Sequence, residues 1–147
     1  MATWQFDICF SNSAIPTDDQ SWLKTPQPRD NAVRLLVHNL PAMTSWSPNL
    51  EQFGNDVGDR VDIYRDEGSI SGITVRFDMN EINLRLMARS VEFAITEGAT
   101  IVDIAKRSLI TSTVEDLAEH IRASSAFSFV SDPDNFFKRL AAQKLLN

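Results

Sequence analysis

The stretch from Ile73 to about Ala105 constrains the possible folds most, because two hydrophobic periods follow each other in it. Apolar residues first alternate with polar ones, as in a strand that buries one face. These residues are Ile73, Val75, Phe77 and Met79. Apolar residues then recur at three- and four-residue intervals, as on the buried side of an amphipathic helix. These residues are Leu84, Met87, Ala88, Val91, Ala94 and Ile95. The sequence therefore predicts a strand followed by a helix.

Local signals place the ends of this helix and the element after it. Asp78-x-x-Glu81 has the spacing of a capping box that would start the helix, and Asn80 is the other candidate cap. Gly98 occupies the place of the left-handed residue that ends many helices. The apolar run around Ile101 then predicts a central strand from Ala99 to about Ala105.

The N-terminal half predicts a strand, a helix and a hairpin. Trp4, Phe6, Ile8 and Phe10 alternate with polar residues and with Cys9, which falls on the polar face. A helix is expected from Asp30, as its cap, to about Leu40. The segment 43–54, MTSWSPNLEQFG, is expected to be a loop with a short helical turn near its end. Val61 and Ile63 then alternate with Asp62 and Tyr64, and Glu67-Gly68-Ser69 supplies a hairpin turn.

The C-terminal part predicts two helices. Ser112 or Thr113 caps the first. Asp132 caps the second, with Pro133 at the first helical position, where its missing N–H costs nothing. The residues expected to face inward on this last helix are Phe136, Phe137, Leu140 and Ala141.

Together these elements predict an α+β fold. Their order matches a ferredoxin-like βαββαβ core, in which a four-stranded antiparallel sheet carries helices on one face, with additional C-terminal helices. A four-stranded α+β sandwich of different topology is the alternative. With 147 residues and 43% hydrophobic residues, the chain has the size and the core of one domain, so we expect a single domain over residues 1–147.

Composition narrows the possible functions. One cysteine and two histidines supply few ligands for zinc and no internal disulfide, so no cofactor and no metal are expected. With 14 basic against 20 acidic residues, neither nucleic acid nor an anionic membrane is an expected partner. No stretch approaches the roughly 18 apolar residues of a membrane span, and the N-terminus lacks the features of a signal peptide. The expected compartment is the cytoplasm.

Catalytic motifs are not evident. Cys9 with His38 or His120 could form a thiol–imidazole pair, but no strained turn surrounds Cys9, and we expect an inert cysteine. The acidic residues from Asp56 to Glu67 lack the spacing of a calcium-binding loop. The protein is therefore expected not to be an enzyme.

An acidic segment, Glu51 to Glu67, is the feature that points to a partner. It holds six carboxylates, which belong to Glu51, Asp56, Asp59, Asp62, Asp66 and Glu67, against the two arginines Arg60 and Arg65. One interpretation is a solvated loop and a charged edge strand, since charge protects exposed strands from aggregation. The other is an interface for a basic partner, with Tyr64 or Trp46 as an aromatic anchor.

Three segments resemble small bacterial immunity-like proteins, the antitoxins encoded beside secreted or contact-delivered toxins. They are FDICFSNSAIP (6–16), GITVRFDMNEINLRLMARSVEFAITEGATIV (72–102) and TVEDLAEHIRASSAFSFVSDPDNFF (113–137). The resemblance implies a cytoplasmic, non-catalytic protein that covers the active surface of a cognate toxin, and the acidic segment predicts that this toxin is basic.

The residues expected to bind this partner are the carboxylates of the acidic segment from Asp56 onward and two aromatic residues. They are Trp46, Asp56, Asp59, Asp62, Tyr64, Asp66 and Glu67. Two other functions stay open. One is a small adaptor or self-associating scaffold that uses an exposed strand edge or the Phe-rich C-terminal helix. The other is an unrecognised enzyme or small-ligand binder with a cleft beside the sheet.

Overall fold

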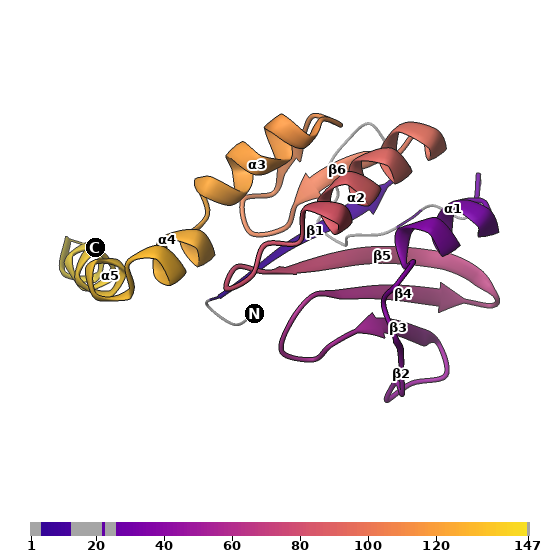
Figure 1. Cartoon of the computed structure of the whole chain (residues 1–147), viewed down its shortest axis with the longest axis horizontal. Helices are drawn as coiled ribbons and strands as arrows, with labels where there is room; N and C mark the ends of the chain where they lie inside the picture. The colour runs from indigo at the N-terminus through magenta and orange to yellow at the C-terminus, as the bar shows by residue number, and fades with distance from the viewer. Residues whose placement is uncertain (1–3, 13–21, 23–25, 147) are drawn as a thin grey trace.

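The computed structural model describes residues 4–12, 22 and 26–146 (Figure 1). The strands are β1 (Gln5–Ser11), β2 (Ala42–Met43), β3 (Leu50–Gly54), β4 (Arg60–Asp66), β5 (Ser69–Asp78), β6 (Thr100–Asp103) and β7 (Ser108–Ile110). The helices are α1 (Asp30–Leu36), α2 (Leu84–Glu97), α3 (Val114–Arg122), α4 (Ser125–Ser131) and α5 (Pro133–Leu146).

Within the described residues the strands form one seven-stranded sheet, and every neighbouring pair in it is antiparallel. The strand order is β2-β3-β4-β5-β1-β6-β7. The N-terminal strand β1 therefore lies inside the sheet, between β5 and β6. The α+β class is confirmed, and the expectation of four strands is wrong.

The three unpredicted strands lie at the two edges of the sheet. β3 and the second residue of β2, Met43, come from segment 43–54, which was predicted to be a loop, and a short turn joins β7 to β6. In β3 the buried positions hold Leu50 and the polar Gln52, while Glu51 between them is exposed. Because a polar residue occupies a buried position, the alternation that identifies a strand is lost from the sequence.

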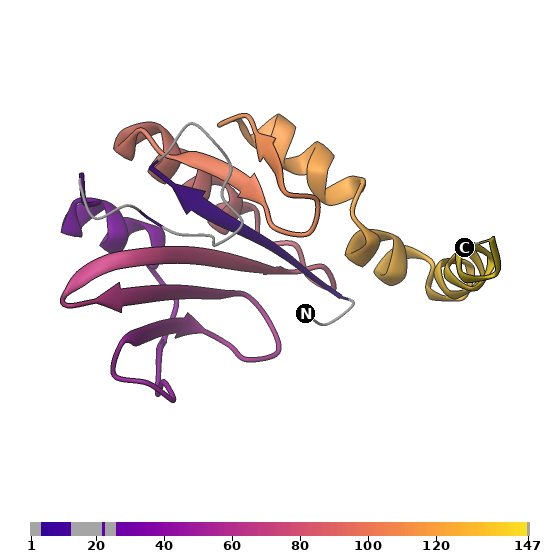
Figure 2. The same cartoon turned by 180° about the vertical axis from the view of Figure 1, so that it is seen from behind.

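One face of the sheet carries the helices, and Figures 1 and 2 show α1 and α2 together on it. Register places Phe6, Ile8 and Phe10 of β1 opposite Phe77, Val75 and Ile73 of β5 on this face. All six side chains are almost completely buried and form the centre of the core. Trp22 extends the core, since its ring meets that of Phe93 from α2 edge-on, with 5.9 Å between centroids.

Local chemistry explains where the helices begin and end. The side chain of Asn83, not that of Asp78 or Asn80, caps α2 by accepting a hydrogen bond from the N–H of Leu86. Gly98 ends α2 in the left-handed conformation with φ 62°, as predicted. Helix α1 is shorter than predicted and ends at Leu36, and its N-cap is Arg29, which makes no side-chain capping bond.

Two further local predictions are confirmed. Thr113 caps α3 by accepting from the N–H of Asp116. Asp132 accepts from the N–H of Asn135 at the start of α5.

The buried side of α2 differs in part from the predicted one, because Leu84, Ala88 and Ile95 are exposed, whereas Leu86 and Phe93 are buried.

Two further expectations about burial are wrong. Cys9 lies on the sheet face away from the helices but is only 1% exposed, because its cross-strand neighbours Thr74 and Val102 flank it on both sides. On α5, Phe137 and Ala141 are exposed, because this helix packs on α4 and extends away from the sheet (Figures 1 and 2). The side chains of Phe136 and Leu140 lie outside the described part of the structure.

Candidate functional site

The acidic segment is divided between the two ends of strand β4. The β3–β4 loop, which holds Asp56 and Asp59, lies at one end, and the turn that holds Glu67 lies at the other. Asp62 lies between them, on the face of the sheet away from the helices. The six carboxylates therefore do not form one continuous patch, and each end has to be considered by itself.

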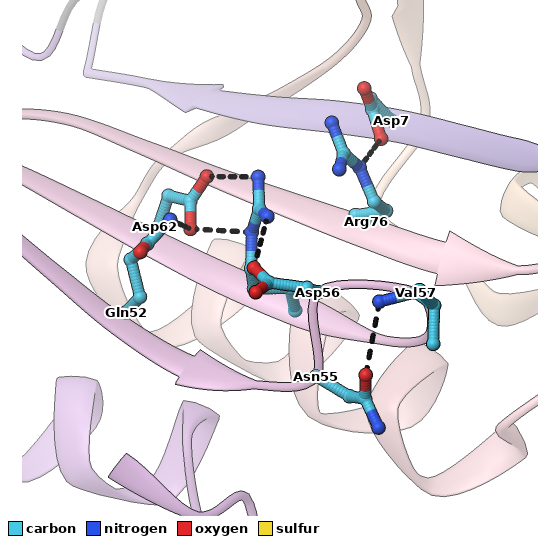
Figure 3. A network of polar contacts seen from close by, with 8 residues as sticks. Asp7, Gln52, Asn55, Asp56, Val57, Asp62 and Arg76 are labelled. Atoms are coloured by element: carbon cyan, nitrogen blue, oxygen red, sulfur yellow. Dashed lines mark hydrogen bonds and ion pairs between the residues drawn. The ribbon is translucent and has the colours of Figure 1, made fainter. Parts of the chain in front are cut away.

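Asp62 is an internal residue of the sheet face, as Figure 3 shows. Its side chain is 8% exposed, and Arg60 Nη2 donates to its Oδ2 at 3.1 Å. Arg60 Nε lies 2.9 Å from Oδ1 of Asp62, an ion-pair distance, although the N–H direction is not aligned for a hydrogen bond. Gln52 Nε2 donates to the same Oδ1 at 3.1 Å. The hydrogen bond of Asp62 with Gln52 therefore links β4 to β3.

Asp56 meets the same arginine from the solvent side. Its Oδ1 lies 3.3 Å from Arg60 Nη1, and its side chain is 77% exposed. Beside it Asn55 Oδ1 accepts the N–H of Val57 and shapes the loop (Figure 3). Asp56 is therefore the carboxylate at this end that a partner can reach.

Asp59 joins the β3–β4 loop to the start of α2. It accepts from the N–H of Asp78 at 2.9 Å and from Asn83 Nδ2 at 3.2 Å, and Asn83 is the residue that caps α2. Burial raises the pKa of the Asp59 carboxyl, and the neighbouring charges of Asp78 and Glu81 raise it further against the two hydrogen bonds. The negative potential at this point is therefore unfavourable for a further carboxylate and favourable for a cation.

A cavity of about 680 Å³ opens beside Asp59, between the β3–β4 loop and the β5–α2 connection. Its acidic lining residues are Asp59, Asp78 and Glu81, against one basic residue, Arg85, and its apolar ones are Leu40, Pro41, Ile82 and Leu84. Ile82 and Leu84 are 40% and 68% exposed. We call this feature the acidic groove.

The hairpin end holds the remaining predicted residues. Glu67 and Gly68 have φ values of 51° and 82°, the two positive values that a tight two-residue hairpin turn requires. The β2–β3 connection is held beside this end by a hydrogen bond from the N–H of Arg65 to the carbonyl of Asn49, 2.8 Å. Trp46 lies in that connection and is 83% exposed. We call Trp46, Tyr64, Asp66 and Glu67 the hairpin-end set.

Tyr64 and Arg65 are separated by a register shift in the β4–β5 pairing. Tyr64 points to the face away from the helices and is 38% exposed. Arg65, the next residue of the strand, points to the helix side, as strand alternation requires. There Arg65 pairs with Glu51, whose charge is thereby compensated. Burial raises the pKa of the Tyr64 hydroxyl, so this group is a neutral hydrogen-bond donor at physiological pH.

The residues considered for catalysis are not brought together. Cys9 lies on the sheet face away from the helices, and burial raises the pKa of its thiol to about 11. His120 lies on α3, on the helix side, with its Nδ1 3.3 Å from Oδ2 of the buried Asp103. The sequence did not indicate this contact, because the two residues are 17 positions apart and lie in different elements. Among the described residues no group of His, Cys, Asp and Glu has a geometry that could hold a metal ion.

Comparison of the chain with protein-family models found no match, and comparison with curated proteins and with solved structures found no significant match. In the part of the chain that the structure describes, no helix combines the length and the apolar composition that a membrane crossing requires.

Proposed function

We propose that this chain is a non-catalytic binding protein of the immunity type, which neutralises a cognate bacterial toxin by covering the toxin's active surface. The expected partner is a basic protein, and the expected compartment is the cytoplasm. The resemblance of three segments to immunity-like proteins and the acidic hairpin region both support this function.

The observation that carries the proposal is the composition of the hairpin end. An 83% exposed tryptophan, Trp46, and a partly exposed tyrosine, Tyr64, lie at the same end of the sheet as the exposed carboxylates Asp66 and Glu67. Large aromatic side chains supply most of the binding energy in many interfaces, whereas clustered charges raise the rate of association. An exposed tryptophan among carboxylates therefore fits a surface that binds a basic protein.

The other predicted residues contribute in different ways. Asp56 is exposed and would extend the contact to the far end of β4. Asp59 and Asp62 are engaged within the fold, so we assign them the role of fixing the loop and the strand pair that carry the exposed groups. Their charge still adds to the negative potential that a basic partner meets.

The test is capture of the partner from the native host with the tagged full-length chain, followed by calorimetric titration of the captured protein. A single basic protein bound one-to-one, with affinity that falls as salt is raised, is the expected result. Trp46→Ala should weaken binding about 30-fold, which corresponds to a hot-spot loss of about 2 kcal/mol. Asp66→Lys with Glu67→Lys should slow association.

A matched control comes from Glu92, an exposed residue in the middle of α2. Glu92→Lys changes the net charge in the same direction away from the hairpin end, so it should leave the association rate nearly unchanged. Equal binding by the wild type and by the hairpin-end variants would refute the proposed surface.

We also propose that the middle of the sheet is a ferredoxin-like βαββαβ core extended at both edges. Strands β4, β5, β1 and β6 are adjacent, and α1 and α2 both lie on one face and contact each other. This order and this placement of helices are those expected for β1-α1-β4-β5-α2-β6. β2 and β3 then extend one edge and β7 the other.

A further inference from the structure

None of the side chains described on helix α5 belongs to the core. It follows α4, packs on it through the edge-on contact of Phe137 with Phe129, 5.4 Å between ring centroids, and extends away from the sheet (Figures 1 and 2). The side chains described on α5 are all exposed, and Phe137 is 53% exposed. A 14-residue helix has little stability alone in water, so contacts beyond this helix are needed to hold it.

The charge of α5 is opposite to that of the protein as a whole. It contains three basic residues, Lys138, Arg139 and Lys144, and one acidic residue, Asp134, in a chain with 14 basic and 20 acidic residues. A partner that complements α5 must therefore offer carboxylates together with apolar surface for Phe137.

The acidic groove offers both carboxylates and apolar surface. It has carboxylates at Asp59, Asp78 and Glu81 and exposed apolar side chains at Ile82 and Leu84. Its volume of about 680 Å³ lies within the range of cavities that enclose several side chains. A cation docked there would be attracted by the three carboxylates, which outnumber the one arginine of the lining, Arg85.

We propose that α5 of one copy docks into the acidic groove of a second copy, so that the chain forms a dimer by reciprocal exchange of its C-terminal helices. Phe137 would cover the apolar rim at Ile82 and Leu84, and Lys138 and Arg139 would meet the carboxylates.

The location of the two surfaces suits such an exchange. Both views show α4, which leads into α5, beside the end of the sheet where β5 leads to α2 (Figures 1 and 2). The groove is lined by residues of this same connection, Asp78 to Leu84. Helix and groove thus lie at one end of the molecule, and a two-fold axis there brings each helix of one copy toward the groove of the other. A contact of this kind closes on itself and gives a dimer rather than a chain of molecules.

The inference is independent of toxin binding, because it is tested on the full-length chain alone. The experiment is sedimentation analysis over a range of protein and salt concentrations. A monomer–dimer equilibrium that weakens with added salt is the expected result. A monomer at every concentration would overturn the proposal, and so would larger open assemblies.

Charge reversal identifies the surfaces. Lys138→Glu with Arg139→Glu should raise the dimer dissociation constant at least tenfold, and Glu81→Lys should do the same from the groove side. Combining the three substitutions restores an opposite charge at position 81 only, because Asp59 and Asp78 stay acidic, so the triple variant should bind more tightly than the Lys138→Glu, Arg139→Glu variant without reaching the wild-type affinity. Glu92→Lys is the matched control for Glu81→Lys, since both residues are exposed and the control lies outside the groove. A dimer that none of these reversals affects would show that another surface is used, and the proposal would be wrong. Far-ultraviolet circular dichroism of each variant checks that it folds.

Discussion

Arg60 and Asp62, two positions apart on β4, point to the same face of the sheet and contact each other through two nitrogen–oxygen pairs, at 2.9 Å and 3.1 Å. The side chains are 16% and 8% exposed, so both charges are largely removed from water. Asp56 approaches the same guanidinium from outside and is 77% exposed. One arginine therefore binds a buried carboxylate and an exposed one, and the two can be compared directly.

Asp62→Ala should lower the free energy of unfolding by about 3 kcal/mol, because it leaves the mostly buried Arg60 without its main counter-charge. Asp56→Ala should change it by less than about 0.5 kcal/mol, since an exposed ion pair contributes little. Urea denaturation of both variants measures the two values. Equal losses would mean that the burial of Asp62 has no energetic consequence.

Asp59 should make stability depend on pH in a defined direction. Its folded-state pKa is raised above the ordinary value of 3.8, chiefly by burial. Between these two pKa values the folded state holds more protons than the unfolded state, so the contribution of Asp59 to stability falls as pH rises.

Asp59→Asn removes this dependence. The difference in unfolding free energy, variant minus wild type, should therefore rise with pH from 3.8 upward and become constant above the folded-state pKa. Denaturation curves at a series of pH values measure it. The constant offset from the altered contact with Asn83 does not affect the slope, and a flat or falling difference would contradict the prediction.

Cys9 should be unreactive in the folded protein. Its side chain is 1% exposed, and burial raises the thiol pKa to about 11, whereas the thiolate is the reactive form. A disulfide reagent at neutral pH should label Cys9 far more slowly in buffer than in denaturant.

The raised pKa of the Cys9 thiol also predicts how the stability of the fold changes at alkaline pH. Between pH 9.0 and about 11 the folded state retains the thiol proton that the unfolded state loses, so stability should fall with rising pH. Cys9→Ala should lack this component of the fall. Rapid labelling of the native protein would show that Cys9 is accessible.

His120 should stabilise the attachment of α3 to the sheet. Its Nδ1 contacts Asp103, whose side chain is 1% exposed and also accepts from the N–H of Lys106. His120→Ala deprives a buried carboxylate of one partner, which should cost about 1–3 kcal/mol. Arg122→Ala, at a 62% exposed position on the same helix, should cost less than about 0.5 kcal/mol. Similar losses in both variants would mean that the contact with Asp103 is not stabilising.

The elements that the sequence predicts well are those with a clear period and a clear end. α2 has apolar residues at helical intervals and Gly98 after it, although Leu84, Ala88 and Ile95 of the predicted stripe are exposed. The β4–β5 hairpin has two alternating strands and a glycine in its turn. The edges of the sheet could not be predicted in this way. β2 and β7 contain two and three residues, too few to show a period, and β3 has Gln52 at a buried position.

The candidate site was predictable as a segment but not as a surface. Neighbouring acidic residues in the sequence separate in space because β4 is extended, and alternate residues of a strand point to opposite faces. Whether a carboxylate is used internally depends on partners distant in the sequence. Asp59 is bound by Asp78 and Asn83, and Asp62 is bound by Gln52 as well as by its near neighbour Arg60.

The position of β1 inside the sheet has a consequence for synthesis of the chain. β1 is made first, yet its two neighbours are β5, which ends at Asp78, and β6, which ends at Asp103. At about 5–20 residues per second, the ribosome needs several seconds between β1 and the completion of β5. Throughout this interval an alternating apolar strand has neither of its native partners. Such a strand is a target for chaperones and for non-native pairing between nascent chains. The topology therefore predicts that folding begins in the β4–β5 hairpin and α2, and that β1 is inserted afterwards.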